Sequence, residues 1–182
     1  MRKIDTLIHA RWVVPVDGPA RVLENHAVAV HHGTIEAVLP CAEARAMFEA
    51  DEVIELDSHA LLPGLINTHT HAAMNLMRGI ANDMPLMPWL TEHIWPIEGE
   101  FMSPEFVADG TDLAMAEMLR CGTTCFNDMY FFPKEIAEAL AGRGMRVSEG
   151  MIVIEFPSAY ASNTEEYFTK VRIGVACCGT VV

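Results

Sequence analysis

The chain has 182 residues, of which 51% are hydrophobic and 20% are charged. This composition is typical of a protein with a sizeable core and excludes a disordered tail. The formal net charge of −13 argues against nucleic acid or an anionic membrane as a partner, because both require a basic surface.

The N-terminus contains no signal-peptide core, because Asp5, His9, Arg11 and Asp17 interrupt its apolar stretches. No run in the sequence approaches the roughly 18 apolar residues that identify a candidate membrane-spanning helix. We therefore expect a soluble, cytoplasmic protein.

The five cysteines do not predict a disulfide framework, since their number is odd and two of them are adjacent. Cys121 and Cys125 have the spacing of half a zinc site, but no second pair of ligands stands at finger-like spacing. Packing of Cys125 in a strand is the favoured interpretation.

The first sixty residues are rich in β-strand patterns. The strand-like runs are residues 7–16, 27–30, 35–38 and 52–56. Gly33 stands between two of these runs as in a hairpin, and residues 41–50 are a short helix candidate. Residues 1–60 are predicted to form half of a composite β-sandwich domain.

From Leu61 onward the pattern changes to alternating strands and helices. Residues 61–69 are almost continuously apolar, as in a strand of a parallel sheet that is covered on both faces. The further strand candidates are residues 123–127 and 146–156, and the helix candidates are residues 106–120 and 134–141. Ser103 and Pro104 form a start signal for the first helix. This order is the opening of a βα series over residues 61–170.

Three strands are too few for a closed eight-stranded barrel, which typically takes about 250 residues. Residues 165–170 look like the start of a helix, but no helical period is evident in residues 171–182. We therefore expect an atypical tail at 171–182, as from a frameshifted or prematurely terminated reading of a longer protein.

His69 and His71 end the apolar run that begins at Leu61. Residues i and i+2 of a strand point to the same face, so the two imidazoles could bind one ion. Thr70 points the other way. In a chain with eight histidines such a pair also arises by chance, but Pro63 and Gly64 indicate that this is no ordinary strand interior.

The stretch from Asp57 through Leu62-Pro63-Gly64-Leu65-Ile66-Asn67-Thr68-His69-Thr70-His71 resembles the first-strand signature of the amidohydrolase superfamily. The segments 76–90 and 93–98 that follow are similar to a narrower branch. This branch holds the methylthioadenosine/S-adenosylhomocysteine deaminases and the triazine-type hydrolases. The similarity extends from about residue 4 to about residue 170.

The resemblance implies a metal-dependent (β/α)₈ TIM barrel, truncated here, beside a β-sandwich. It also implies that His69 and His71 bind Zn²⁺ or another divalent metal ion, one per intact subunit. A metal-activated water would then displace the amino group of a nucleoside-like substrate. The acid–base residues are expected beyond the end of this chain, so the catalytic residues stay unknown.

The same resemblance implies substrate-binding roles for Trp89, as an aromatic wall, and for Glu98, as a carboxylate that faces ribose hydroxyls. Core packing of Trp89 and simple solvation of Glu98 are the alternatives. Asp128 ends a strand and is either a functional residue or a loop cap. His93 is expected to pack in its loop, and the hairpin pair His31-His32 is expected to be solvent-exposed.

The expected function is metal-dependent hydrolysis of a C–N bond other than a peptide bond, with deamination of methylthioadenosine, S-adenosylhomocysteine or adenosine. The alternatives are a catalytically incompetent fragment of such an enzyme and a related triazine- or guanine-type amidohydrolase. The expected partner is a small-molecule substrate, without nucleic acid or membrane, and assembly into a homo-oligomer stays open.

Overall fold

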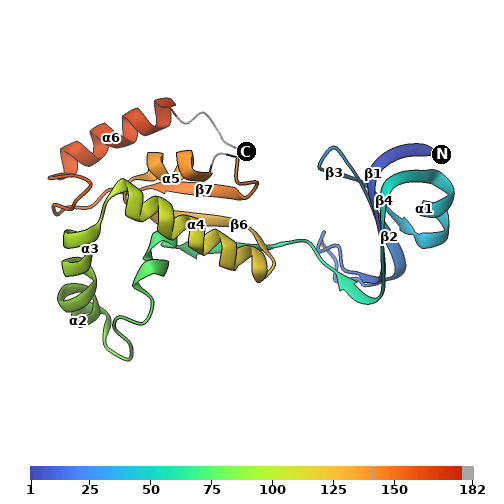
Figure 1. Cartoon of the computed structure of the whole chain (residues 1–182), viewed down its shortest axis with the longest axis horizontal. Coiled ribbons are helices and arrows are strands. Elements are labelled where there is room, and N and C mark those ends of the chain that lie inside the picture. Colours follow the sequence, from blue (N-terminus) through green and yellow to red (C-terminus); the bar gives the residue numbers. More distant parts are fainter. Residues whose placement is uncertain (141, 178–182) are drawn as a thin grey trace. The chain divides into compact units, whose positions relative to one another are not determined.

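The computed structural model describes residues 1–140 and 142–177. The chain forms two compact units, Met1–Pro63 and Gly64–Val182 (Figure 1). They are called the N-terminal unit and the C-terminal unit below. Among the described helices, none is long and apolar enough to cross a membrane.

The N-terminal unit is one four-stranded sheet with a short helix. Its elements are β1 (Arg2–Val13), β2 (Leu23–His31), β3 (Thr34–Pro40), α1 (Cys41–Met47) and β4 (Phe48–Leu61). The strand order is β3-β2-β1-β4, with β1 antiparallel to β2 and parallel to β4. The predicted hairpin turn is present, and Gly33 adopts a φ of 72° there, which only glycine adopts readily.

The C-terminal unit is a three-stranded parallel sheet with helices. Its strands are β5 (Leu65–Thr70), β6 (Thr123–Tyr130) and β7 (Arg146–Met151). Its helices are η1 (Ala72–Met77), α2 (Leu86–Pro88), η2 (Trp89–Ile94), α3 (Trp95–Phe101), α4 (Pro104–Arg120), α5 (Pro133–Leu140) and α6 (Thr164–Cys177). The strand order is β5-β6-β7, as expected for successive βα units.

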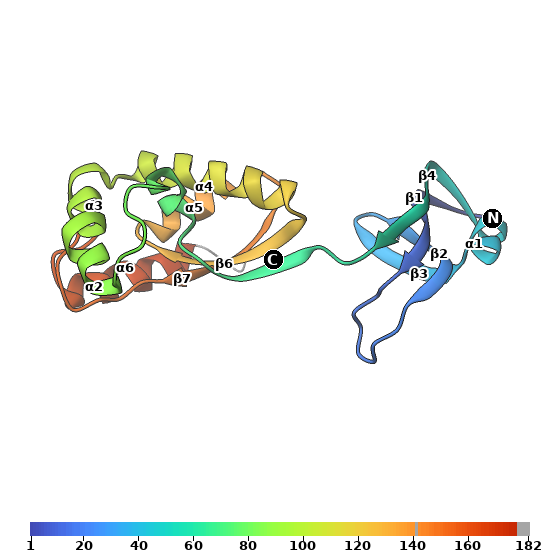
Figure 2. The same cartoon turned by 90° about the horizontal axis from the view of Figure 1, so that it is seen from below.

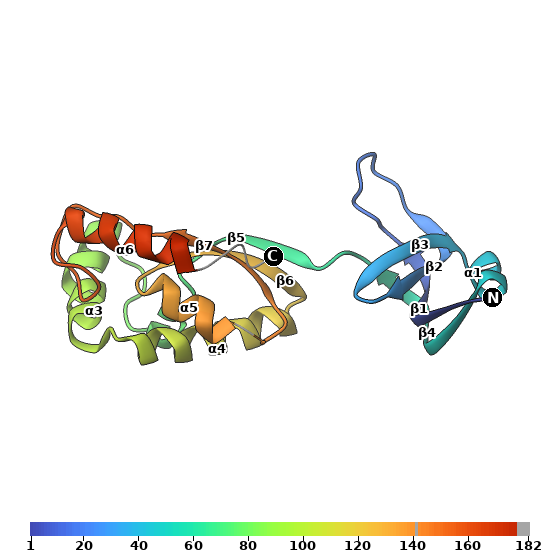
Figure 3. The same ribbon diagram turned by 90° about the horizontal axis from the view of Figure 1, so that it is seen from above.

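Helices α4 and α5 lie along the same side of this sheet (Figures 2 and 3). Strand β5 begins at one end of the C-terminal unit. The short helices α2 and α3 lie at the opposite end, and the carboxyl ends of the strands are found there (Figure 2). In α/β folds this end of the sheet carries the functional residues.

Local signals set the position of α4. The side chain of Ser103 accepts a hydrogen bond from the backbone N–H of Phe106 at 3.1 Å, and Pro104 opens the helix, as predicted. Gly110 allows α4 to lie close to the segment after β5, since a Cβ there would be 2.5 Å from the carbonyl oxygen of Ala73. Gly64 similarly lies against Thr124, where a Cβ would overlap its side chain.

The core of the C-terminal unit lies between the sheet and its helices. Phe126 of β6, Val107 of α4, Ile136 of α5 and Tyr167 of α6 are each 0% exposed and belong to one cluster. Burial of such side chains contributes about 1.5–3 kcal/mol each. Because this packing joins all four elements, it fixes β6 relative to the helices.

Two boundaries differ from those predicted from the sequence. Helix α6 continues to Cys177, so the helical pattern does not end at Lys170 as expected for an atypical tail at 171–182. Helix α6 packs on the core through Tyr167. Packing of this kind stabilises a helix whose sequence shows no extended pattern of apolar residues. Residues 178–182 of that tail lie outside the described residues. Strand β7 ends at Met151, before the predicted end at 156.

Candidate metal centre and adjoining cavity

His69 and His71 meet at the carboxyl end of β5. Their Nε2 atoms are 3.4 Å apart and their rings are nearly perpendicular, at 81°. Four nitrogen ligands placed tetrahedrally at 2.0–2.1 Å from a zinc ion are about 3.3–3.4 Å from one another. The pair therefore has the separation that two ligands of one zinc ion require.

A backbone carbonyl orients His71. Its Nδ1 lies 2.7 Å from the carbonyl oxygen of Met129 in β6, which can only accept, so Nδ1 carries the proton and donates. In a neutral imidazole the other nitrogen, Nε2, is then unprotonated. A metal-binding histidine typically shows this arrangement, with its second nitrogen bonded to a carbonyl or carboxylate.

Asp128 lies next to the end of β5 but is not grouped with the two imidazoles as a possible ligand among the described residues. In the register of the sheet it pairs with Thr70. Asp128 is 0% exposed, and its Oδ1 accepts hydrogen bonds from Thr70 Oγ1 and from the Ala72 N–H, both at 2.9 Å. Burial raises the pKa of Asp128, while these hydrogen bonds lower it.

A cavity of about 310 Å³ begins at His71. The residues that line it include Trp89 and Glu98. Three of the four site residues predicted from the sequence therefore line one cavity, and the fourth, His69, touches His71. This volume lies at the lower end of the range for small-molecule sites, about 300–1,000 Å³.

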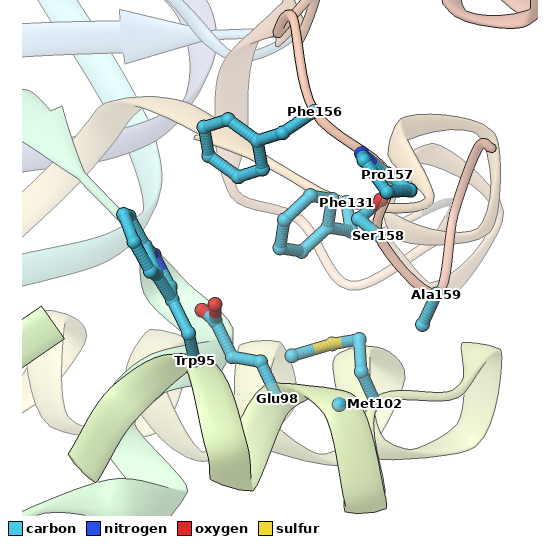
Figure 4. A pocket seen from close by; sticks show the side chains of 9 residues that line it. Trp95, Glu98, Met102, Phe131, Phe156, Pro157, Ser158 and Ala159 are labelled. Carbon is cyan, nitrogen blue, oxygen red and sulfur yellow. The ribbon is translucent and has the colours of Figure 1, made fainter. Parts of the chain in front are cut away.

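Glu98 is the carboxylate of this cavity. Tyr130 donates its hydroxyl hydrogen to Glu98 Oε1 at 2.6 Å. Burial raises the pKa of Glu98, and the hydrogen bond from Tyr130 and the charge of His71 lower it. A second cavity, of about 460 Å³, shares Glu98, Trp95 and Phe156 with the first and extends to Met102 (Figure 4).

Glu149 and Tyr130 were not singled out in the sequence. Glu149 lies beside Asp128 in the register of β6 and β7. Both of its carboxylate oxygens are buried and have no hydrogen-bond partner among the described residues. Burial, together with the charge of Asp128, raises its pKa to about 9. An acid inside a strand candidate, two residues before the apolar run 151–154, is the signal that could have identified it.

Two other histidine positions lie away from this centre. His93 is in η2 and is absent from the lining of the His71 cavity. In the N-terminal unit, Asp5 Oδ1 lies 2.8 Å from His31 Nδ1 and Asp5 Oδ2 accepts from the His32 N–H at 2.6 Å. Asp5, His31 and His32 bring three possible ligand atoms together. His31 is thus half-buried rather than exposed as expected.

Residues 60–177 match the amidohydrolase family. The chain belongs to this family. The 5-methylthioadenosine/S-adenosylhomocysteine deaminase of Saccharophagus degradans is 46% identical over 91% of this chain and 37% of its own length. That of Thermodesulfovibrio yellowstonii is also 46% identical, over 91% of this chain and 38% of its own. The chain thus spans less than two fifths of these curated relatives.

The solved structures agree with these relatives. An adenosine deaminase from Xanthomonas campestris with bound zinc superimposes with a TM-score of 0.93, at 49% identity over 97% of this chain and 40% of its own. A triazine hydrolase from Arthrobacter aurescens gives a TM-score of 0.81 at 20% identity, over 97% and 43% of the two chains, and this likeness shows the fold alone. The predicted family and fold class, a β-sandwich part followed by the first units of a TIM barrel, are confirmed.

Proposed function

We propose that this chain supplies the first-strand metal ligands and part of the substrate pocket of an adenosine-type deaminase. The observation that carries the proposal is the 3.4 Å separation of His69 Nε2 and His71 Nε2, with His71 Nδ1 bonded to Met129. The reaction is hydrolysis of a C–N bond other than a peptide bond. The substrate class is methylthioadenosine, S-adenosylhomocysteine or adenosine, in line with the names of the relatives.

The proposed cofactor is Zn²⁺ or another divalent metal ion, one per subunit. When bound, such an ion makes water a nucleophile near neutral pH. A catalytic zinc usually has three protein ligands, whereas no third histidine, cysteine or carboxylate joins His69 and His71 among the described residues. We therefore expect further ligands, and the acid–base residues, from barrel strands outside the described residues.

The proposed roles of Trp89 and Glu98 follow from their place in the cavity beside His71. The indole of Trp89 offers a flat apolar surface of the size of a purine. The carboxylate of Glu98 accepts one hydrogen bond from Tyr130, and an ionised carboxylate can accept several. Glu98 would thus accept hydrogen bonds from the ribose hydroxyls while His71 holds the metal at the ring to be deaminated.

A chimeric enzyme tests the proposal. In this chimera the chain replaces the matching segment of the Xanthomonas campestris deaminase. That segment makes up 40% of the deaminase. We expect the chimera to bind one zinc ion and to release ammonia from methylthioadenosine or adenosine. His69→Asn should remove the metal, whereas Glu98→Gln should keep the metal and raise KM. A folded chimera that binds no zinc would overturn the proposal.

The 182-residue chain by itself should bind the metal weakly and release no ammonia, because its described residues offer two ligands at this centre. Ammonia release by the chain alone would contradict this expectation. A substrate panel on the chimera also tests the triazine- and guanine-type alternatives, whose solved structures are less than 25% identical to this chain. A location in the cytoplasm and assembly into a homo-oligomer stay predictions.

A further inference from the structure

His71 lies just outside the strand that carries its partner ligand. Strand β5 ends at Thr70, and the last pair in its register with β6 is Thr70 with Asp128. His71 has backbone angles outside the helical region, φ −127° and ψ 72°, and the 3-10 helix η1 begins after it. The position of His71 therefore depends on what holds the residues on either side, in addition to its own hydrogen bond with Met129.

One carboxylate oxygen, Oδ1 of Asp128, lies within hydrogen-bond distance of the residue before His71 and of the residue after it. Asp128 Oδ1 accepts from the backbone N–H of Ala72 and lies within hydrogen-bond distance of the hydroxyl of Thr70, each at 2.9 Å. The same hydroxyl lies 3.0 Å from the carbonyl oxygen of Asn127 in β6. The residue of β6 after Asp128, Met129, accepts the Nδ1 hydrogen of His71 itself at 2.7 Å. Two adjacent residues of β6 thus fix three consecutive residues at the end of β5.

The burial of Asp128 makes these contacts stronger. Its side chain is 0% exposed, and hydrogen bonds to a carboxylate in a region of low dielectric are about twice as strong as neutral ones. Among the described residues no basic side chain forms an ion pair with it, and its Oδ2 has no partner. Burying a carboxylate without a basic partner costs free energy. A contribution to the stability of the fold therefore does not explain why an acid stands at this position.

We propose that Asp128 is the positioning residue of the histidine pair: by holding Thr70 and Ala72 it directs His71 Nε2 towards the metal shared with His69. This inference rests on the proposed function for the metal, but it concerns a residue with no place in the ligand set. Asp128 does not belong to the ligand set, because among the described residues no carboxylate oxygen lies close to the imidazole nitrogens of both His69 and His71.

Variants at Asp128 separate positioning from ligation. Asp128→Asn keeps an oxygen that can accept from Thr70 and Ala72, whereas Asp128→Ala removes it. In the 182-residue chain, Co²⁺ titration followed by absorption reports metal affinity, and ¹H–¹⁵N NMR of the imidazoles reports the tautomer of His71 without any metal. We expect Asp128→Ala to weaken Co²⁺ binding about 10–100-fold and to mix the tautomers, while Asp128→Asn stays close to wild type in both measurements.

A matched pair at Thr70 covers the case that Asp128→Ala fails to fold. Thr70→Val removes the hydroxyl donor at nearly constant shape, and Thr70→Ser retains it. Thr70→Val should weaken Co²⁺ binding, by less than Asp128→Ala because the Ala72 N–H remains, and Thr70→Ser should not.

Three results would overturn the inference. The first is a folded Asp128→Ala chain with wild-type Co²⁺ affinity and tautomer. The second is equal weakening by Asp128→Asn and Asp128→Ala, which would indicate a role of charge or direct ligation. The third is equal binding by the two Thr70 variants. If the wild-type chain binds Co²⁺ too weakly to be titrated, the tautomer of His71 decides the role of Asp128, while zinc binding by the chimera decides the proposed function.

Discussion

The two units differ in their buried carboxyl groups. Both have ion pairs near the surface, such as Arg45 with Glu55 at 2.8 Å in the N-terminal unit and Arg143 with Asp112 at 2.7 Å in the C-terminal unit. In the C-terminal unit, Glu98, Asp128 and Glu149 are largely withdrawn from water near the carboxyl ends of the strands, and burial raises the pKa of each. Carboxyl groups with perturbed pKa values in one place indicate a functional site.

Histidines show the same contrast. His9 lies in the middle of β1 and is 3% exposed, and burial lowers its pKa, so it is a neutral core side chain. His69 and His71 lie at the end of β5, where they reach solvent and a cavity. Identical side chains thus serve packing in one unit and form a candidate metal centre in the other, because of where each strand ends.

The largest effect is expected from the ligands themselves. His71→Asn in the chimera should reduce bound zinc and turnover to background, since the ion then loses one of its imidazole ligands. The matched control is His32→Asn in the N-terminal unit, where asparagine tolerates the φ of 49°. Metal analysis of the purified proteins checks this. Loss of the catalytic metal in His32→Asn would break the contrast between the units.

Core truncation should affect the units separately. Phe126 is 0% exposed, so Phe126→Ala should lower the stability of the C-terminal unit by about 3–5 kcal/mol. Leu7→Ala, at 3% exposure, should lower that of the N-terminal unit by about 2–5 kcal/mol. Hydrogen exchange measured by peptide follows each unit. Equal loss of protection in both units from either variant would show that they unfold as one.

Glu149 should make the C-terminal unit less stable as pH rises. Its pKa is about 9 in the fold and 4.5 ordinarily, so between these values the folded chain binds a proton that the unfolded chain has released. Stability then falls by up to about 1.4 kcal/mol per pH unit from about pH 5 to about pH 9. Glu149→Gln should flatten this dependence in denaturant melts, apart from the part due to Asp128. An unchanged slope would contradict the burial of Glu149 in solution.

The smallest effect is expected at the surface of the N-terminal unit. Arg45→Ala removes the ion pair between Arg45 and Glu55. Both side chains are about half exposed to solvent. Such pairs contribute about 0–1 kcal/mol, so urea unfolding should change within that range and less in high salt. A loss well above it would show that this unit, too, depends on its charged residues.

Much of the chain's local structure was predictable because it depends on neighbours in sequence. The cap at Ser103, the turn at Gly33 and the strand period that places His69 and His71 on one face are of this kind. The segment from Leu62 to His71 and the loop after it also predicted the family. The end of α6 was not predicted, because residues 171–177 show no helical period of apolar residues in the sequence.

Tertiary structure decided what surrounds the histidine pair. The contacts of Asp128 with Thr70 join residues 58 positions apart, and those of Tyr130 with Glu98 join residues 32 positions apart. Side-chain period gives the face of a strand on which a residue lies, but it contains nothing about which strand becomes its neighbour. The sequence by itself thus determined the two candidate ligands, and only the parallel pairing of β5 with β6 determined how they are held.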